Sequence, residues 1–323
     1  MLDLLKECKG AKTIAITGHI RPDGDCIGSA MALYLFLKKK MTDAKIRVFL
    51  EHPSDKFAII KDFNEIDNEK PEDDYAPDIY IMVDVDKDRV GISEGLFEKA
   101  KKTINIDHHI SNKNGCGDVN YVVPEAGSAA EVCYDVIGKE NIDYDIAVAI
   151  YIGMIHDTGI FQYSNTSPKT LRIAADLISY GFDFTSIIEN TFYEKTYVQT
   201  QILGRALLES ILFLDGECVV SHMDQKTMNF YGATTNDMEG IVSRLRNIKG
   251  VECAVFMYEL APQQYKVSLR SSKYIDCRKI AEVFGGGGHI RAAGCNLNGT
   301  FYDAVNNLSK YIEIQVKEHR EER

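Results

Sequence analysis

The stretch from Gly18 to Asp25 concentrates side chains that can bind a metal ion. His19, Asp23 and Asp25 fall within seven residues, directly after the apolar run Thr13–Thr17, which has the composition of a buried strand. A proline and a glycine separate them, so we expect a tight turn, rather than a helix or strand, to hold them. Two carboxylates one residue apart repel each other unless a cation lies between them. The pattern therefore predicts a metal site.

Further ligand-type residues follow apolar segments along the chain. An isolated aspartate in such a place is more often a turn or capping residue, but a whole set of them indicates one shared site. The further ligand-type residues are Asp84 after residues 79–83, then Asp107, His108 and His109 after residues 103–106, and Asp157 after residues 148–155.

These side chains suit two metal ions. Asp23, Asp25, Asp84 and Asp157 carry four negative charges, which balance two divalent cations, while His19 and His108 add neutral nitrogens. Mixed oxygen and imidazole ligation favours two Mn²⁺ ions, with Mg²⁺, Co²⁺ or Fe²⁺ as substitutes. Two such ions about 3.5 to 4 Å apart can share a hydroxide and clamp the oxygens of an in-line displacement at phosphorus. We expect Asp84 to bridge them.

The first half of the chain alternates strand-like and helix-like segments. Strand patterns at residues 13–17, 46–50, 79–83 and 103–106 are separated by helical patterns such as residues 26–40. This alternation predicts an α/β domain with a parallel sheet, which places ligands at the carboxyl ends of its strands.

Composition sets the outer limits. The chain has 323 residues, of which 45% are hydrophobic, enough for two domains. A formal charge of -11 argues against binding of long nucleic acid. The eight cysteines form no C-x-x-C pair, as is typical of reduced core residues. Neither a signal peptide nor a membrane-spanning segment is evident, so we expect a cytoplasmic protein.

The pattern changes near Asn190. We expect a first domain over residues 1–190, a helical linker over residues 191–214, and a smaller mixed-sheet α/β domain over residues 215–323. The substrate would bind in a cleft between the domains.

The second domain contains residues suited to anion binding. Arg270 follows a strand pattern, and its guanidinium fits a phosphate. Four glycines follow the helical pattern 276–284 and indicate a turn whose N–H groups can face an anion. His289 and Arg291 come directly afterwards.

The order of these motifs resembles that of the DHH phosphoesterase family. The N-terminal motifs are His19-x-x-x-Asp23-x-Asp25, Asp84, Asp107-His108-His109 and Asp157, and Gly285 to Gly294 resembles the family's associated C-terminal domain. The resemblance covers nearly the whole chain. Within the family, the compact two-domain layout is most similar to members that hydrolyse short oligoribonucleotides and dephosphorylate 3′-phosphoadenosine 5′-phosphate.

The resemblance implies a role for each matching residue. His19, Asp23 and Asp84 would bind one manganese, and Asp25, Asp84, His108 and Asp157 the other. Asp107 would orient a histidine from behind the ligands, and His109 would face the scissile phosphate as a catalytic donor. In the C-terminal domain, the implied substrate contacts are Arg270, Gly286, Gly287, Gly288, His289 and Arg291.

The implied function is manganese-dependent hydrolysis of short oligoribonucleotides (nanoRNA) to mononucleotides and of 3′-phosphoadenosine 5′-phosphate to AMP. Its partners would be short RNA and small phosphorylated nucleotides, with no long duplex and no membrane. Two alternatives stay open: a phosphodiesterase for cyclic or linear dinucleotides such as c-di-AMP or pApA, and a non-catalytic nucleotide sensor. A family II pyrophosphatase is disfavoured because its C-terminal domain differs. Both a monomer and a homodimer are compatible with the sequence.

Overall fold

The computed structural model describes residues 2–321, and it divides into two compact units that meet at Glu194 and Lys195. This boundary falls inside the expected linker. Residue 1 and residues 322–323, at the ends of the two expected domains, lie outside the described residues.

The first unit is built on a parallel sheet with the strand order β3-β2-β1-β4-β5-β6. The strands are β1 (Thr13–Thr17), β2 (Lys45–Phe49), β3 (Ile66–Asp67), β4 (Ile79–Val83), β5 (Lys102–Asp107) and β6 (Val119–Val122). In a doubly wound sheet of this order, the order in which strands are added reverses between β1 and β4, and ligands bind at that point. The predicted parallel α/β domain is confirmed.

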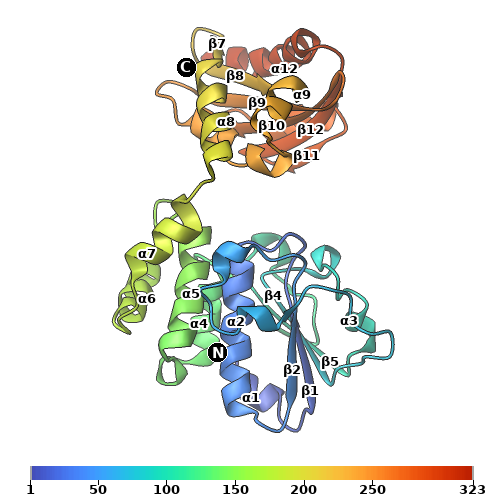
Figure 1. Cartoon of the computed structure of the whole chain (residues 1–323), viewed down its shortest axis with the longest axis vertical. Coiled ribbons are helices and arrows are strands. Elements are labelled where there is room, and N and C mark those ends of the chain that lie inside the picture. Colours follow the sequence, from blue (N-terminus) through green and yellow to red (C-terminus); the bar gives the residue numbers. More distant parts are fainter. Residues whose placement is uncertain (1, 322–323) are drawn as a thin grey trace. The chain divides into compact units, whose positions relative to one another are not determined.

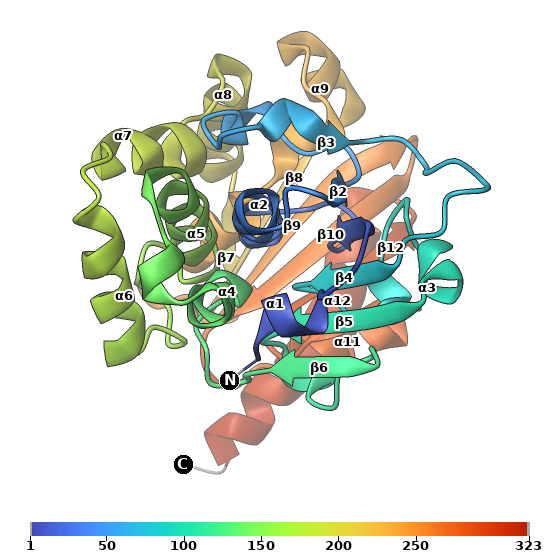
Figure 2. The same ribbon diagram turned by 90° about the horizontal axis from the view of Figure 1, so that it is seen from below.

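Helices cover both faces of this sheet, α2, α4 and α5 on one and α3 on the other (Figures 1 and 2). The helices are α1 (Leu4–Glu7), α2 (Gly24–Lys40), α3 (Leu96–Lys99), α4 (Ala129–Ile137), α5 (Tyr144–Asp157), α6 (Pro168–Ile178) and α7 (Phe184–Ile188), with a π-helical turn at Glu189–Tyr193. Both α2 and α5 are almost wholly buried, as expected for apolar helices in a doubly covered sheet.

The second unit has a mixed sheet in the order β11-β12-β10-β9-β8-β7, in which only the β8–β9 pairing is parallel among the described strands. Helices α11 and α12 pack on one face, and α8, α9 and α10 on the other. The elements are α8 (Tyr197–Leu208), β7 (Ile211–Phe213), β8 (Cys218–Met223), α9 (Gln225–Tyr231), α10 (Ile241–Arg246), β9 (Cys253–Ala261), β10 (Gln264–Ser271), α11 (Cys277–Val283), β11 (Gly287–His289), β12 (Ala292–Asn298) and α12 (Phe301–Glu321).

Two expectations from the sequence concern this second unit. The helix expected as a linker is α8, which buries Ile202 and Ala206 against the sheet of the second unit. The turn predicted for the four glycines is wrong for Gly287 and Gly288, which together with His289 form an edge strand paired with β12. The glycine at 286 permits the close approach, since a Cβ there would lie 2.2 Å from the Gly294 carbonyl oxygen.

Across the described residues, no helix is both long enough and apolar enough to cross a membrane. All eight cysteines fall within that part of the chain, and all are free thiols.

The crossing of α2 and α5 depends on a glycine. A Cβ at Gly28 would lie 2.4 Å from the Ala149 carbonyl oxygen and 2.8 Å from the Gly153 nitrogen, both backbone atoms of α5. This close packing brings the start of α2 to the end of α5, where Asp25 and Asp157 are found.

We expect Gly28→Ala to destabilise the first unit by about 1–3 kcal/mol, because the added methyl group must push the two helices apart. The measurement is thermal or urea unfolding followed by circular dichroism. A matched control is Gly204→Ala in α8, where a Cβ meets no atom within 4 Å. That change should add about 0.5–1 kcal/mol of stability. Stabilisation by both changes would contradict the tight crossing.

Candidate metal centre

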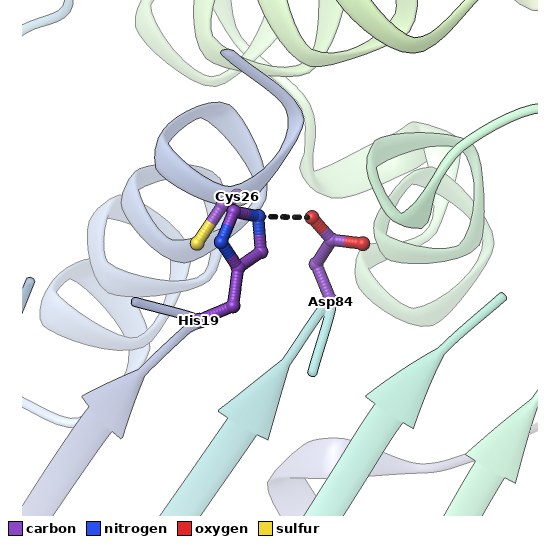
Figure 3. A group of neighbouring side chains, drawn as sticks. All are labelled: His19, Cys26 and Asp84. Carbon is purple, nitrogen blue, oxygen red and sulfur yellow. Dashed lines mark ion pairs between the residues drawn. The ribbon is translucent and has the colours of Figure 1, made fainter. Parts of the chain in front are cut away.

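The three neighbouring strands β1, β4 and β5 each end in residues of the predicted site. His19 follows β1, Asp84 follows β4, and His108 follows β5. Because these strands are parallel and adjacent, their carboxyl ends bring the three side chains to one edge of the sheet. Figure 3 shows the His19 ring and the Asp84 carboxylate facing each other above the ends of two strands.

Helix ends supply the remaining carboxylates. Asp23 caps α2, and its Oδ1 accepts hydrogen bonds from the amides of Asp25 at 3.0 Å and Cys26 at 3.1 Å. Asp25 therefore lies in the first turn of α2, and the predicted turn is wrong for this residue. Asp157 is the last residue of α5.

Asp84 lies between two histidines. Its Oδ2 is 3.5 Å from His19 Nε2, and its Oδ1 is 3.5 Å from His108 Nε2. On the first side, His19 Nε2 is also 3.7 Å from Asp23 Oδ1. On the second side, His108 Nε2 is 3.6 Å from an oxygen of Asp157. The carboxylate thus presents one oxygen to each of two ligand groups.

The histidines are oriented by backbone carbonyls. His19 Nδ1 donates to the Ile20 carbonyl oxygen at 2.8 Å, and His108 Nδ1 donates to that of Ala126 at 3.3 Å. A proton on Nδ1 leaves Nε2 as the metal-binding nitrogen. In both rings Nε2 is the atom that faces the carboxylates.

His109 is held differently. Its Nδ1 donates to Asp107 Oδ1 at 2.8 Å, and its side chain is 36% exposed. Asp107 is fully buried and also accepts hydrogen bonds from the His108 amide and from Asn112 Nδ2, both at 2.7 Å. The Asp107 carboxylate raises the pKa of His109, which favours a proton on this ring near neutral pH.

Two of the acidic groups, Asp25 and Asp157, are destabilised as anions. Burial, together with the neighbouring Asp84 and Asp157, raises the pKa of Asp25 well above its usual value. Burial is also the main reason that the pKa of Asp157 rises to about 6. Asp84 is only 3% exposed, and its Oδ1 accepts no hydrogen bond, although His108 Nε2 and His109 Nδ1 lie 3.5 and 3.6 Å away. A buried carboxylate oxygen without a hydrogen bond is costly. This donor set therefore fits divalent cations.

Cys26 lies beside this cluster although its sequence position did not suggest a ligand. His19, Cys26 and Asp84 offer ligand atoms within 4.8 Å of one another (Figure 3). Burial, with the nearby Asp84 charge, raises the pKa of the Cys26 thiol well above its usual value. The protonated thiol is a poor metal ligand.

The predicted substrate residues all belong to the second unit. Arg270 is half-buried on β10, and its Nη1 donates to the Leu269 carbonyl oxygen at 3.0 Å. Arg291 Nη1 donates to the Ile275 carbonyl oxygen at 3.0 Å. His289 is exposed on β11.

The glycine amides are only partly free to bind an anion. The amides of Gly285 and Gly286 donate to carbonyl oxygens of α11, at 3.1 and 2.9 Å. They close the end of that helix. Gly287 and Gly288 lie on the edge strand β11.

Comparison with known proteins identifies the family. The model of the DHH family N-terminal domain matches residues 13–154, and the DHHA1 domain matches residues 216–318. The chain therefore belongs to the DHH family of phosphoesterases, as the order of its motifs predicted.

Relatives align over nearly the whole chain. The protein named bifunctional oligoribonuclease and PAP phosphatase NrnA from Bacillus subtilis is 27% identical over 98% of this chain and 99% of its own length. Its namesake from Thermus thermophilus is 28% identical over 93% of this chain and 88% of its own length.

Solved structures share the fold. An exopolyphosphatase-related protein from Bacteroides fragilis superposes with a TM-score of 0.85 at 26% identity, covering 96% of this chain and 94% of its own. RecJ from Thermus thermophilus, crystallised with Mn²⁺, has a TM-score of 0.54 at 14% identity, covering 96% of this chain and 53% of its own.

We expect metal binding to release protons. Burial lowers the pKa of His19 and His108, but the surrounding carboxylates outweigh it and raise both to about 10 in the metal-free protein. Both rings therefore carry a proton at pH 7 that a metal ion must displace. Because these pKa values are raised, the ion pairs stabilise the metal-free fold fully below the unfolded value of about 6.5. That stabilisation is lost as the pH rises through about 10.

Titration calorimetry with Mn²⁺ in buffers of different ionisation enthalpy measures this release. We expect about two protons per protein from the two histidines at pH 7, with any proton on Asp25 released in addition, and an affinity that rises between pH 6 and 8. Binding without proton release would contradict the assignment of the two histidines as ligands.

Proposed function

We propose that this protein hydrolyses short oligoribonucleotides to mononucleotides and converts 3′-phosphoadenosine 5′-phosphate to AMP. The observation that carries the proposal is the Asp84 carboxylate, whose two oxygens face two separate histidine and carboxylate groups. The names of the full-length relatives support the choice of substrates. The free state of the eight cysteines supports a reducing compartment, the cytoplasm.

The proposed metals are two Mn²⁺ ions, with Mg²⁺, Co²⁺ or Fe²⁺ as substitutes. One would be held by His19, Asp23 and Asp84, and the other by Asp25, Asp84, His108 and Asp157. When bound, such a pair activates water and neutralises charge on the phosphate. The two oxygens of Asp84 support its role as the shared ligand.

His109 is proposed as the catalytic donor. His109 Nδ1 donates a hydrogen bond to Asp107, so Nε2 is the ring nitrogen that can contact a substrate. A proton there can stabilise charge on the phosphate or pass to the leaving oxygen. The exposure of the His109 side chain, in contrast to the buried Asp107, supports this division of roles.

The second unit would select the substrate. We propose that Arg270, Arg291, His289 and the glycines Gly286, Gly287 and Gly288 contact its phosphate or base. Arg270 is half-buried, and among the described residues no carboxylate forms an ion pair with it. A guanidinium in that state is well suited to an incoming phosphate. Because the amides of Gly285 and Gly286 already donate to α11, a backbone N–H for the substrate would have to come from Gly287 or Gly288.

The domain limits 1–190, 191–214 and 215–323 stay part of this proposal. The substrate would be only a few nucleotides long. The net charge of -11 supports small anions over long strands.

A side-by-side turnover assay tests the substrate assignment. With Mn²⁺ present, the protein should release mononucleotides from RNA of two to five residues and phosphate from 3′-phosphoadenosine 5′-phosphate. Asp84→Asn should abolish both activities, since it removes the charge shared by the two ligand groups. Turnover of cyclic dinucleotide alone would favour the alternative phosphodiesterase, and nucleotide binding without turnover would favour a sensor.

Arg270→Ala should weaken substrate binding, raising KM about 10- to 100-fold with a smaller change in kcat, as for a charged hydrogen bond made equally in ground and transition states. Arg278→Ala is the control. Arg278 lies in the same unit, exposed on α11, and already faces Glu282 and Asp276 at 3.8 and 3.9 Å. Equal losses in kcat and kcat/KM for Arg270→Ala would instead place this arginine in the chemical step.

A further inference from the structure

One backbone segment, Ala126–Ala130, orients two members of a single ligand group. The carbonyl oxygen of its first residue accepts from His108 Nδ1 at 3.3 Å. The first two amides of α4 donate to the two carboxylate oxygens of Asp25, at 2.7 and 2.9 Å. A carboxylate at a helix N-terminus is stabilised by the free N–H groups and by the helix dipole. The segment therefore fixes both His108 and Asp25.

Asn165 connects the third member of that group, Asp157, to the same segment. Asn165 Nδ2 lies 2.8 Å from the Gly127 carbonyl oxygen. The same nitrogen lies 3.2 Å from the Asp157 carbonyl oxygen and 3.3 Å from its Oδ2. The amide group thus joins the end of α5 to the segment that starts α4.

The loop between Asp157 and Asn165, which brings Asn165 back to the end of α5, is strained. Ile160 and Phe161 have φ angles of 55° and 63°, in the left-handed region. This conformation costs L-residues roughly 1–2 kcal/mol each, and strain of this kind clusters at functional sites. The side chain of Thr158 supports the loop, since its Oγ1 accepts from the Phe161 amide at 3.1 Å.

We propose that Asn165 is a positioning residue that fixes the Asp157 carboxylate against the Ala126–Ala130 segment, and so preorganises the Asp25–His108–Asp157 half of the site for a divalent ion. This inference rests on the proposed function, which takes these three residues as ligands. An asparagine suits the task because its two N–H hydrogens can serve the Gly127 carbonyl and Asp157 together. Its neutral side chain also adds no negative charge beside Asp157.

The other half of the site does not depend on Asn165. His19 is oriented by the carbonyl of Ile20, and Asp23 by the first amides of α2. Loss of the Asn165 amide should therefore affect the two ions unequally. This asymmetry separates a positioning role from a general loss of stability.

The test is the binding of Mn²⁺ alone to the full-length protein, measured by calorimetry and by electron paramagnetic resonance of the free ion. The unaltered protein should bind two ions. Asn165→Ala should weaken one of them about 10- to 100-fold, the usual effect of losing a partner of a metal ligand, and leave the other unchanged. Asn165→Ser, which keeps one donor, should fall between, and it replaces the alanine variant if that variant does not fold.

The matched control is Asn141→Ala. Asn141 lies in the same unit, and its Nδ2 also donates to a backbone carbonyl, that of Ile137 at 2.8 Å, away from the ligands. This variant should bind both ions normally at a similar loss of thermal stability. Unchanged binding, or equal weakening of both ions, in the Asn165 variants would overturn the inference. Failure of the unaltered protein to bind two ions would instead contradict the proposed function.

Discussion

The main physical constraint on this structure is the repulsion among carboxylates that the fold brings together at one edge of a sheet. Asp25 and Asp84 are almost completely buried, and Asp23 and Asp157 stand beside them. In the metal-free protein, protonated histidines and a raised pKa at Asp25 and Asp157 relieve this repulsion. Divalent cations would relieve it better, since two of them match the four negative charges. The cost of assembling these acids in a folded chain is the strongest physical argument for metal binding.

The scaffold makes the assembly possible by using the ends of rigid elements. Parallel strands supply His19, Asp84 and His108, while the start of α2 and the end of α5 supply the other carboxylates. The close crossing at Gly28 brings these two helix ends together. Asp84 itself has a φ of 59°, an uncommon conformation that an aspartate tolerates better than most residues. Each proposed ligand is thus placed at the end of a strand or a helix.

The parallel sheet and most of the site residues could be predicted from the sequence because each is indicated by a short local pattern. Apolar runs that end in His19, Asp84 or His108 predict strands with ligands at their carboxyl ends, and the parallel sheet is as expected. Asp25 was expected in a turn because Pro22 and Gly24 precede it. The capping bonds of Asp23 instead start the helix at Gly24.

Other features could not be predicted from the sequence because they arise from contacts between residues that are distant along the chain. Cys26 joins the cluster only through the packing of α2 against β1 and β4, and Asn165 reaches Asp157 only through a strained loop. A run of glycines usually predicts a turn, yet here Gly287 and Gly288 pair with β12 because missing side chains also allow close strand packing.

We propose that two divalent ions share the Asp84 carboxylate. The most direct measurement is anomalous diffraction at the manganese absorption edge from crystals grown with Mn²⁺. The account predicts two peaks, one between Asp84 and His19 and the other between Asp84 and His108. A single peak, or ions bound away from the Asp84 carboxylate, would contradict it.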